Sequence, residues 1–394
     1  MKKSIINNSV SKDKNALIKL KLLKLYKKNN PSLPTNLKKR LKTTEKTFNR
    51  LSFPLRFLKN LTVGDFACGT GEYCMVASKY ASRVDGYDFN KISIDKAKIN
   101  SKKLKIKNCN FYQKEFFLKK KKYDLVICTA ALHHLPNPYQ GLKYLQQRVK
   151  KGGFLLLSFG LDSSNITHNL LKLIVRNWGK NENDINKSSK FLFKNHIDRC
   201  VKFGLRKEEA VIADQFINTQ HYYMNLKKVF KILEKSFVLH GSWPPKFLPQ
   251  SDSINNITTQ NTDFRFSEIL WSTKTIDDNL RAKSFLINAN LNSFKKLKST
   301  LNNKSNKSLN EILKKNKFLF SKNNFKYSQF DFSFSLNSHV INFYKELFEL
   351  MIFFNKKKRN LYETKKEIDK KKFIFKGTNG LGLNHFLFRK IDEK

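Results

Sequence analysis

The sequence predicts an α/β protein built on a doubly wound, mostly parallel seven-stranded sheet with helical insertions. Three features indicate this fold class. Short apolar segments alternate with helical ones between residues 61 and 159, a glycine-rich turn follows the first apolar segment, and an aspartate ends the second. Such alternation is typical of parallel sheets whose strands are joined by right-handed helical crossovers.

The expected core elements follow one another from residue 61 onward. Strands are predicted at residues 61–67, 83–89, 108–112, 123–129 and 154–159, with helices at 73–81, 93–103 and 139–150. The fourth of these strands is continuously apolar, which is typical of a strand buried on both faces. Lys151-Gly152-Gly153 is expected to turn the chain into the fifth strand.

Composition and pattern divide the chain into six parts. We expect a basic helical N-terminal extension at 1–50, a cofactor-binding core at 51–160, a helical insertion and candidate substrate lid at 161–224, a helix and sixth strand at 225–249, a Lys- and Asn-rich insertion or small extra domain at 250–380, and a last strand within 381–394. Residues 384–390 are expected to lie beside the fifth or sixth strand. The sheet then has seven strands.

The charge of the chain is a weak guide to its partners. The formal net charge is +47, yet only 12 of the 78 basic residues are Arg. Abundant Lys, Asn, Ile and Phe together are typical of AT-rich codon usage, whereas phosphate and base recognition favours the planar fork of Arg. Nucleic-acid binding is therefore possible but not favoured.

Other features of the composition favour a reduced cytoplasmic protein. No apolar run approaches the roughly 20 residues that span a bilayer, and no apolar region follows the basic N-terminus as in a secretory signal. The five cysteines show neither the density of a disulfide framework nor zinc-ligand spacing. We expect no metal site from the sequence. The oligomeric state is left open.

A glycine-rich turn follows the first strand, at Cys68-Gly69-Thr70-Gly71-Glu72. Glycines let backbone N–H groups approach a ligand closely. A dinucleotide fingerprint needs a third glycine where this chain has Glu72, and a carboxylate there is a poor neighbour for pyrophosphate. No Gly-Lys-Ser/Thr of a Walker A loop follows either.

Asp88 ends the second strand, 17 residues after Gly71. In a doubly wound sheet this places a carboxylate beside the glycine turn, at the edge where ligands bind. A carboxylate there can accept hydrogen bonds from both hydroxyls of a ribose. Turn and carboxylate within one βαβ unit favour a nucleoside-containing ligand over a purely structural role.

These residues resemble the class I S-adenosylmethionine (SAM)-dependent methyltransferases over about residues 55–160. Residues 65–71 are similar to the first motif, with Ala67 where glycine is usual. The third, fourth and fifth strands carry similar motifs at 113–116, 123–135 and 149–153. The resemblance implies a Rossmann-like methyltransferase fold, an enzyme, and SAM as cofactor.

The resemblance also implies roles for individual residues. Asp88 corresponds to the ribose-binding acid, Glu115 to the contact with the adenine amino group, and Phe116 to a neighbour of the base. The implied cofactor-binding residues are Asp65, Ala67, Cys68, Gly69, Gly71, Asp88, Phe89, Glu115, Phe116 and Thr129.

The residues after the fourth strand indicate the acceptor. Residues 129–132 read Thr-Ala-Ala-Leu in place of the Asn/Asp-Pro-Pro-aromatic signature of base amino-group methylation, and Cys128 lies within the strand, outside a Pro-Cys or Thr-Cys pair. The following Leu-His-His-Leu-Pro is similar to the branch that includes quinone and other O- or C-methyltransferases. His133 and His134 are candidate general bases, since imidazole titrates near neutrality. Capping or fixing the loop is their alternative role.

Polar and aromatic residues beyond the core are candidates for the substrate site. They are Asp214, His221, Tyr222 and Trp243. If residues 161–224 are inserted above the sheet edge, these side chains would line an acceptor pocket. A packed hairpin with surface aromatics is the alternative.

The sequence therefore favours a SAM-dependent methyltransferase that acts on a small or medium metabolite at an O or C atom by in-line displacement. Two alternatives stay open. One is an RNA methyltransferase whose basic extensions bind phosphates, which would give steeply salt-dependent binding. The other is a non-catalytic SAM-fold module that binds an acidic partner through its lysines.

Overall fold

The computed structural model of the chain describes the core of the protein and parts of its C-terminal region. The described residues are 17, 20–27, 30, 33–117, 121–160, 166–218, 221–222, 224–243, 346, 349–350, 353–354, 360–372, 374–375 and 383–391. Residues 250–345, which make up most of the expected Lys- and Asn-rich insertion, lie outside them.

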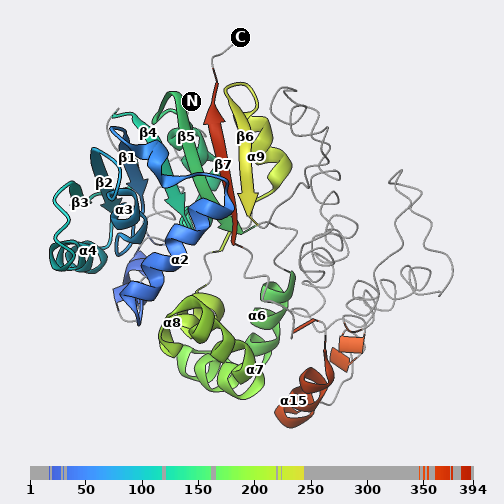
Figure 1. The fold of residues 1–394 in the computed structure, drawn as a ribbon. Coiled ribbons are helices and arrows are strands. Elements are labelled where there is room, and N and C mark those ends of the chain that lie inside the picture. Colours follow the sequence, from blue (N-terminus) through green and yellow to red (C-terminus); the bar gives the residue numbers. More distant parts are fainter. Residues whose placement is uncertain are drawn as a thin grey trace, which may run out of the picture.

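In the described part of the chain, seven strands form a single sheet, which confirms the predicted fold class (Figure 1). Its order is β3-β2-β1-β4-β5-β7-β6, and only β7 runs antiparallel to its neighbours. The strands are β1 (Thr62–Phe66), β2 (Arg83–Asp88), β3 (Cys109–Gln113), β4 (Tyr123–Thr129), β5 (Val149–Gly160), β6 (Phe237–Trp243) and β7 (Leu383–Lys390). Strand order reverses between β1 and β4, so ligands are expected at the carboxyl ends of these strands.

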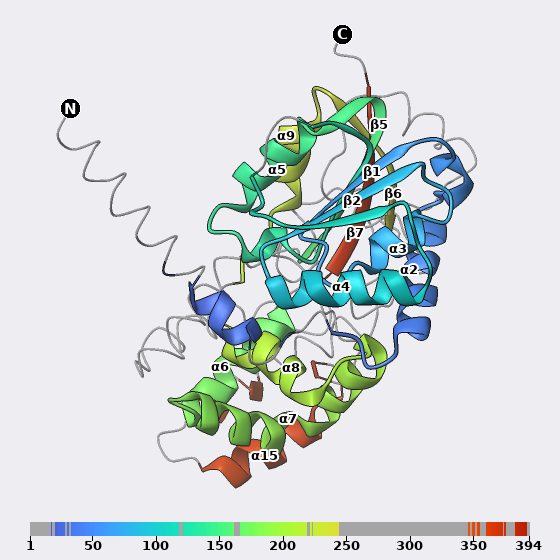
Figure 2. The same cartoon turned by 90° about the vertical axis from the view of Figure 1, so that its left-hand side faces the viewer.

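Helices cover both faces of the sheet (Figure 2). One face carries α2 (Leu37–Arg50), α3 (Glu72–Ala77) and α4 (Lys91–Lys103), and the other carries α5 (Pro138–Gln146) and α9 (Leu226–Leu233). The central strand β4 is buried on both faces, as its apolar run predicts. None of the helices in the described part of the chain is both long and apolar enough to cross a membrane.

The fifth strand begins earlier than predicted. Val149 already pairs with Tyr123 of β4, and the register then shifts before Leu125 pairs with Phe154. Gly152 has φ +72° within this irregularity. The predicted turn at residues 151–153 is therefore a bulge within β5, because glycine allows the chain to kink there without leaving the sheet.

A second helical layer lies at the carboxyl ends of the parallel strands (Figure 1). It comprises α6 (Ile166–Trp178), α7 (Glu182–Gly204), α8 (Glu208–Ile212), the π-helix η3 (Ala213–Ile217) and α15 (Leu361–Lys370). We call it the helical cap. It has its own apolar core, to which Leu350, Phe354 and Ile368 also contribute. Segments more than 130 residues apart in the sequence therefore build one layer.

The N-terminal extension packs against this edge of the sheet as well. Residues 20–27 are helical, and the side chains of Leu22 and Tyr26 are buried. The Thr35 N–H donates to the carbonyl of Leu205 at the end of α7 (2.8 Å), and the Asn30 amide donates to Ser93 Oγ of α4 (2.9 Å). The extension thus joins the cap to the core.

Replacing Gly64 with Ala should destabilise the fold. A Cβ atom at Gly64 would lie 2.5 Å from Tyr123 Cδ2, and this ring is fully buried with its hydroxyl bonded to Asp85 and Tyr87. We expect the free energy of unfolding to fall by about 1–3 kcal/mol in urea denaturation, as for other overpacked cores. Gly204→Ala is the matched control, because its Cβ would meet only Arg206 atoms at 3.7 Å or more. Equal losses in both variants would contradict this account.

Candidate active site

The glycine turn between β1 and α3 is built from left-handed backbone. Ala67, Gly69 and Gly71 have φ values of +61°, +56° and +82°. Glycine adopts this region without strain, whereas Ala67 pays a steric cost that persists only where the surrounding fold fixes the turn. A Cβ at Gly71 would lie 2.6 Å from the Phe111 ring. The fold therefore leaves no room for a larger residue at Gly71.

Asp88 joins the turn to the tip of β2. Its Oδ2 accepts from the Gly69 N–H (2.9 Å) and its Oδ1 accepts from the Asn90 N–H (2.8 Å). Each carboxylate oxygen has two lone pairs, so one acceptor position per oxygen is still available for ligand hydroxyls. Burial raises the pKa of Asp88, which the two N–H donors counteract. The two features that the sequence placed side by side are in direct contact.

Two further carboxyl groups are buried near Asp88. Asp65, at the end of β1, accepts from the Cys74 thiol (3.4 Å) through Oδ2, while its buried Oδ1 has no hydrogen-bond partner among the described residues. Burial raises the pKa of Asp65 to about 8, and the charges of Asp88 and Glu72 add to this effect. Burial also raises the pKa of Glu72. This acidic cluster is complementary to a positively charged ligand.

The other residues implied in cofactor binding surround the same strand ends. Cys68 donates its N–H to the Tyr87 carbonyl (2.9 Å), and Phe89 follows Asp88 half-buried. Thr129 ends β4. Beyond β3, Glu115 is exposed, whereas the Phe116 ring packs against the Phe66 ring, with 6.3 Å between centroids.

His133 and His134 follow β4 in the short helix η2 (Leu132–His134). His133 is only 6% exposed, its Nδ1 is buried without a hydrogen-bond partner among the described residues, and burial lowers its pKa well below 6.5. Nε2 of His134 lies 3.1 Å from the hydroxyl of Tyr26. The pair therefore connects the β4 edge to the N-terminal helix.

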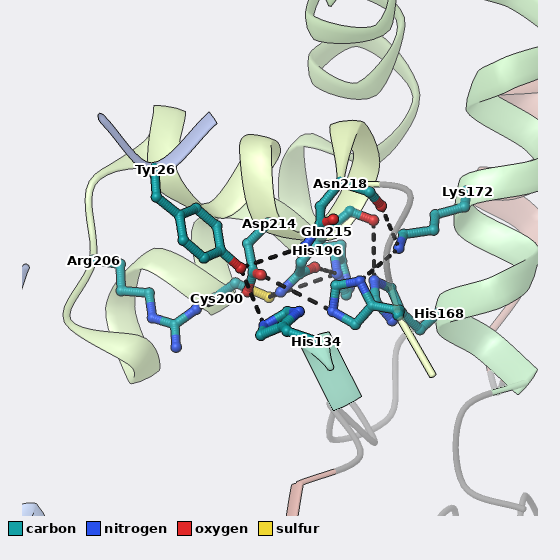
Figure 3. A network of polar contacts seen from close by, with 11 residues as sticks. Tyr26, His134, His168, Lys172, His196, Cys200, Arg206, Asp214, Gln215 and Asn218 are labelled. Carbon is teal, nitrogen blue, oxygen red and sulfur yellow. Dashed lines mark hydrogen bonds and ion pairs between the residues drawn. The ribbon is translucent and has the colours of Figure 1, made fainter. Parts of the chain in front are cut away.

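The helical cap adds a polar network to these histidines (Figure 3). Lys172 Nζ lies 3.1 Å from His221 Nδ1 and donates to the Asn218 carbonyl (2.9 Å). The Asn218 amide in turn donates to the Tyr26 hydroxyl (3.4 Å), and Arg206 forms an ion pair with Asp214 (3.0 Å). The cap thus places cationic and amide groups beside the histidines.

Asp214 and His221 bring two of the four predicted substrate side chains here, whereas Tyr222 contributes its backbone N–H and places its exposed ring against Tyr139. Asp214 Oδ1 is 4.0 Å from His221 Nε2, and the Tyr222 N–H donates to the His133 carbonyl (2.8 Å). Trp243 lies elsewhere, at the end of β6, where the guanidinium of Arg50 stacks 4.7 Å from its ring centroid.

Several residues of this network were not identified by the sequence analysis. They are Tyr26, His168, Lys172, Arg206 and Asn218. None belongs to a motif, and they come from the N-terminal helix and the cap. The sequence contains one indication of this network, the run of polar and aromatic residues at 214–223. That run indicates which segment takes part, but it does not indicate the residues that the segment contacts.

One protein-family profile and several curated proteins are similar to this chain, and all carry methyltransferase names. A family profile described as "Methyltransferase domain" matches residues 58–225. The ubiquinone biosynthesis O-methyltransferase of Coxiella burnetii is 29% identical over 104 residues, which are 26% of this chain and 44% of that protein. The same-named protein of Saccharophagus degradans is 31% identical over 98 residues, covering 24% and 41%. The chain spans less than half the length of these curated relatives.

Solved structures with similar folds were also found. Magnesium protoporphyrin IX methyltransferase of Synechocystis, crystallised with bound SAM, is 23% identical with a TM-score of 0.28, covering 31% of this chain and 59% of that one. PKMT2 of Rickettsia typhi is 14% identical with a TM-score of 0.41, covering 66% and 51%.

Replacing Asp65 with Asn should change how stability depends on pH. The pKa of Asp65 is raised in the folded protein, so the folded state retains a proton that the unfolded chain has released between about pH 4 and about pH 8. Wild-type stability therefore falls over this window by up to about 1.4 kcal/mol per pH unit from this group alone. The Asn variant lacks this loss.

We expect the free energy of unfolding of Asp65→Asn, measured in urea at pH 5 and pH 8, to gain on the wild type as the pH rises. Asp95→Asn serves as the control, because this carboxylate is exposed in an ion pair with Lys91. A difference between Asp65→Asn and the wild type that stays constant over this range would show that Asp65 is ionised in the folded protein.

Proposed function

We propose that the protein transfers a methyl group from SAM to a hydroxyl oxygen of a small molecule. Residues 58–225, which match a family profile described as "Methyltransferase domain", support this proposal. The observation that carries the proposal is the contact between the glycine turn and Asp88, with its two N–H donors at 2.8 and 2.9 Å. The names of the curated relatives support an oxygen acceptor on a small molecule.

The residues around the turn fit SAM chemically. SAM carries a sulfonium, an ammonium group and two ribose hydroxyls, and it supplies an activated methyl group for in-line displacement. The remaining lone pairs of Asp88 suit ribose hydroxyls. Asp65 Oδ1, buried without a partner in the described structure, suits a cationic N–H donor. A cation bound beside Asp65 would lower the raised pKa of that carboxyl group and so favour its ionised form.

The surroundings of His133 and His134 suit the acceptor. For methyl transfer the protein mainly has to align the acceptor and exclude water. The helical cap and the Tyr26 helix cover this edge of the sheet, and His134, Lys172 and Asn218 supply polar contacts. Of the two candidate bases, His133 is the poorer, since burial keeps its pKa well below 6.5.

Replacing Asp88 with Ala should weaken SAM binding. The change removes ribose acceptors and also releases the Gly69 N–H, and hydrogen bonds to charged groups contribute about 1.5–3 kcal/mol each. We expect a Kd at least 10-fold higher by calorimetry with SAM and with S-adenosylhomocysteine. Asp95→Ala, on the exposed surface of α4, should bind as the wild type does. Equal affinity in Asp88→Ala would exclude Asp88 from the cofactor site.

The acceptor class can be tested with labelled SAM. Purified protein is incubated with methyl-labelled SAM and a cell extract, and the label is followed into small-molecule, RNA and protein fractions. We expect label in the small-molecule fraction, and none with Asp88→Ala. Label in RNA or protein would overturn the proposed acceptor while leaving the methyltransferase assignment intact.

A further inference from the structure

Five of the histidines in the described part of the chain lie close together. They are His133, His134, His168, His196 and His221, which come from η2, α6, α7 and the segment after η3. Ring centroids are 4.1 Å apart for His133 and His134, 5.0 Å for His134 and His221, and 5.3 Å for His133 and His221. Apolar side chains would fill this space at lower cost, so the concentration of imidazoles requires a chemical explanation.

Three of these rings converge on one point. His133, His134 and His221 each offer a ring nitrogen, and these three nitrogens lie within 4.8 Å of one another. A neutral imidazole keeps a lone pair on one ring nitrogen, which can coordinate a metal ion. Nδ1 of His133 is buried without a hydrogen-bond partner in the described structure, and an unpaired buried polar atom carries a desolvation cost. A shared cation would remove that cost.

We propose that His133, His134 and His221 form a binding site for a divalent transition-metal ion such as Zn²⁺. Imidazole is a preferred ligand of Zn²⁺, Co²⁺ and Ni²⁺. Three histidines with an open fourth position are the arrangement of catalytic zinc sites, with Zn–N distances of about 2.0–2.1 Å. His134 and His221 are intermediate in burial, and 10% of the His221 side chain is exposed.

The groups around the three rings resemble the outer shell of a metal site. Metal-bound histidines commonly bond through the other ring nitrogen to an oxygen group. Nε2 of His134 lies 3.1 Å from the Tyr26 hydroxyl, and Nε2 of His221 lies 4.0 Å from the Asp214 carboxylate.

Lys172 is the group that opposes metal binding. Its ammonium lies 3.1 Å from His221 Nδ1, where it repels a cation and favours the proton on Nε2. It also donates to the Asn218 carbonyl at 2.9 Å, so it keeps a partner when His221 turns to a metal ion. We therefore expect Lys172 to weaken, but not to prevent, metal binding.

The location of the site suggests its use, a step that rests on the proposed function. His133 and His134 directly follow β4, beside the strand ends that carry Asp65 and Asp88, and the charges of Asp88 and Asp214 both act on Tyr26. A metal ion there would bind the acceptor hydroxyl at its open position and lower its pKa. The histidines would then act as ligands in place of a general base.

Direct metal binding tests the proposal without SAM and without any assay of methyl transfer. The full chain is treated with a chelator, dialysed, and titrated with Co²⁺ while the visible d–d absorption and the heat are recorded. We expect one Co²⁺ per chain with nitrogen–oxygen coordination, displaced by Zn²⁺. Intense near-ultraviolet thiolate absorption would instead assign the ion to the cysteines and overturn the proposal.

Variants identify the ligands. His133→Ala and His221→Ala should each raise the Kd for Co²⁺ more than 100-fold, while His240→Ala on β6, whose ring bonds the Ser52 carbonyl, should bind as the wild type does. Circular dichroism and SAM binding report whether each variant is folded. Folded His133→Ala and His221→Ala variants that bind Co²⁺ as tightly as the wild type would disprove the site.

Lys172→Met should change the affinity for Co²⁺ in the direction opposite to that of the histidine variants. Removing the ammonium should tighten Co²⁺ binding about 10-fold, whereas unchanged affinity would contradict the assignment of His221 as a ligand. Because Asp88→Ala tests the SAM site separately, failure of metal binding and failure of the proposed methyl transfer can be told apart.

Discussion

The hydrogen bond from the Gly69 N–H to Asp88 connects the two halves of the nucleotide-binding edge. It fixes the glycine turn against the tip of β2 and, together with the Asn90 N–H, opposes the rise in the pKa of Asp88 that burial causes. The left-handed backbone at Ala67 is tolerated because the turn is fixed in this way. The acidic cluster, and with it the fit to a cationic ligand, depends on this contact.

The helical cap forms a second layer at that edge, with a hydrophobic core separate from the cores that pack on the sheet. The helical cap has its own core, drawn from residues 170–216 and from residues near 350–375. Tyr26 and Thr35 tie the N-terminal extension to it through Asn218 and Leu205. Two segments remote in sequence therefore cover one edge of the sheet, beside the place where chemistry is proposed.

The histidines gather where these layers meet. Hydrogen bonds join a lysine, an amide and imidazoles into one network here, in which the buried Nδ1 of His133 lacks a partner among the described residues. Such a network holds its geometry only because the sheet edge, the cap and the N-terminal helix each contribute members. A change in any of the three layers would alter the others.

The sequence alone determined those features that depend on residues close together in the chain. Alternating apolar segments, the glycine turn and Asp88 define strands, crossovers and the cofactor edge, because these depend on periodicity and on residues close together in one βαβ unit. β5 starts at Val149 because this residue pairs with β4 before the bulge. Such pairing is not visible in the local sequence pattern, so the start of β5 was predicted too late.

The residues that surround the carboxyl ends of the parallel strands could be identified only from the tertiary structure. His133 and His221 are 88 positions apart, and Tyr26 and Asn218 are 192 apart. No local pattern encodes such contacts, because they arise from how the cap and the N-terminal helix pack on the sheet. Trp243, which the sequence grouped with His221, instead packs on Arg50 for the same reason.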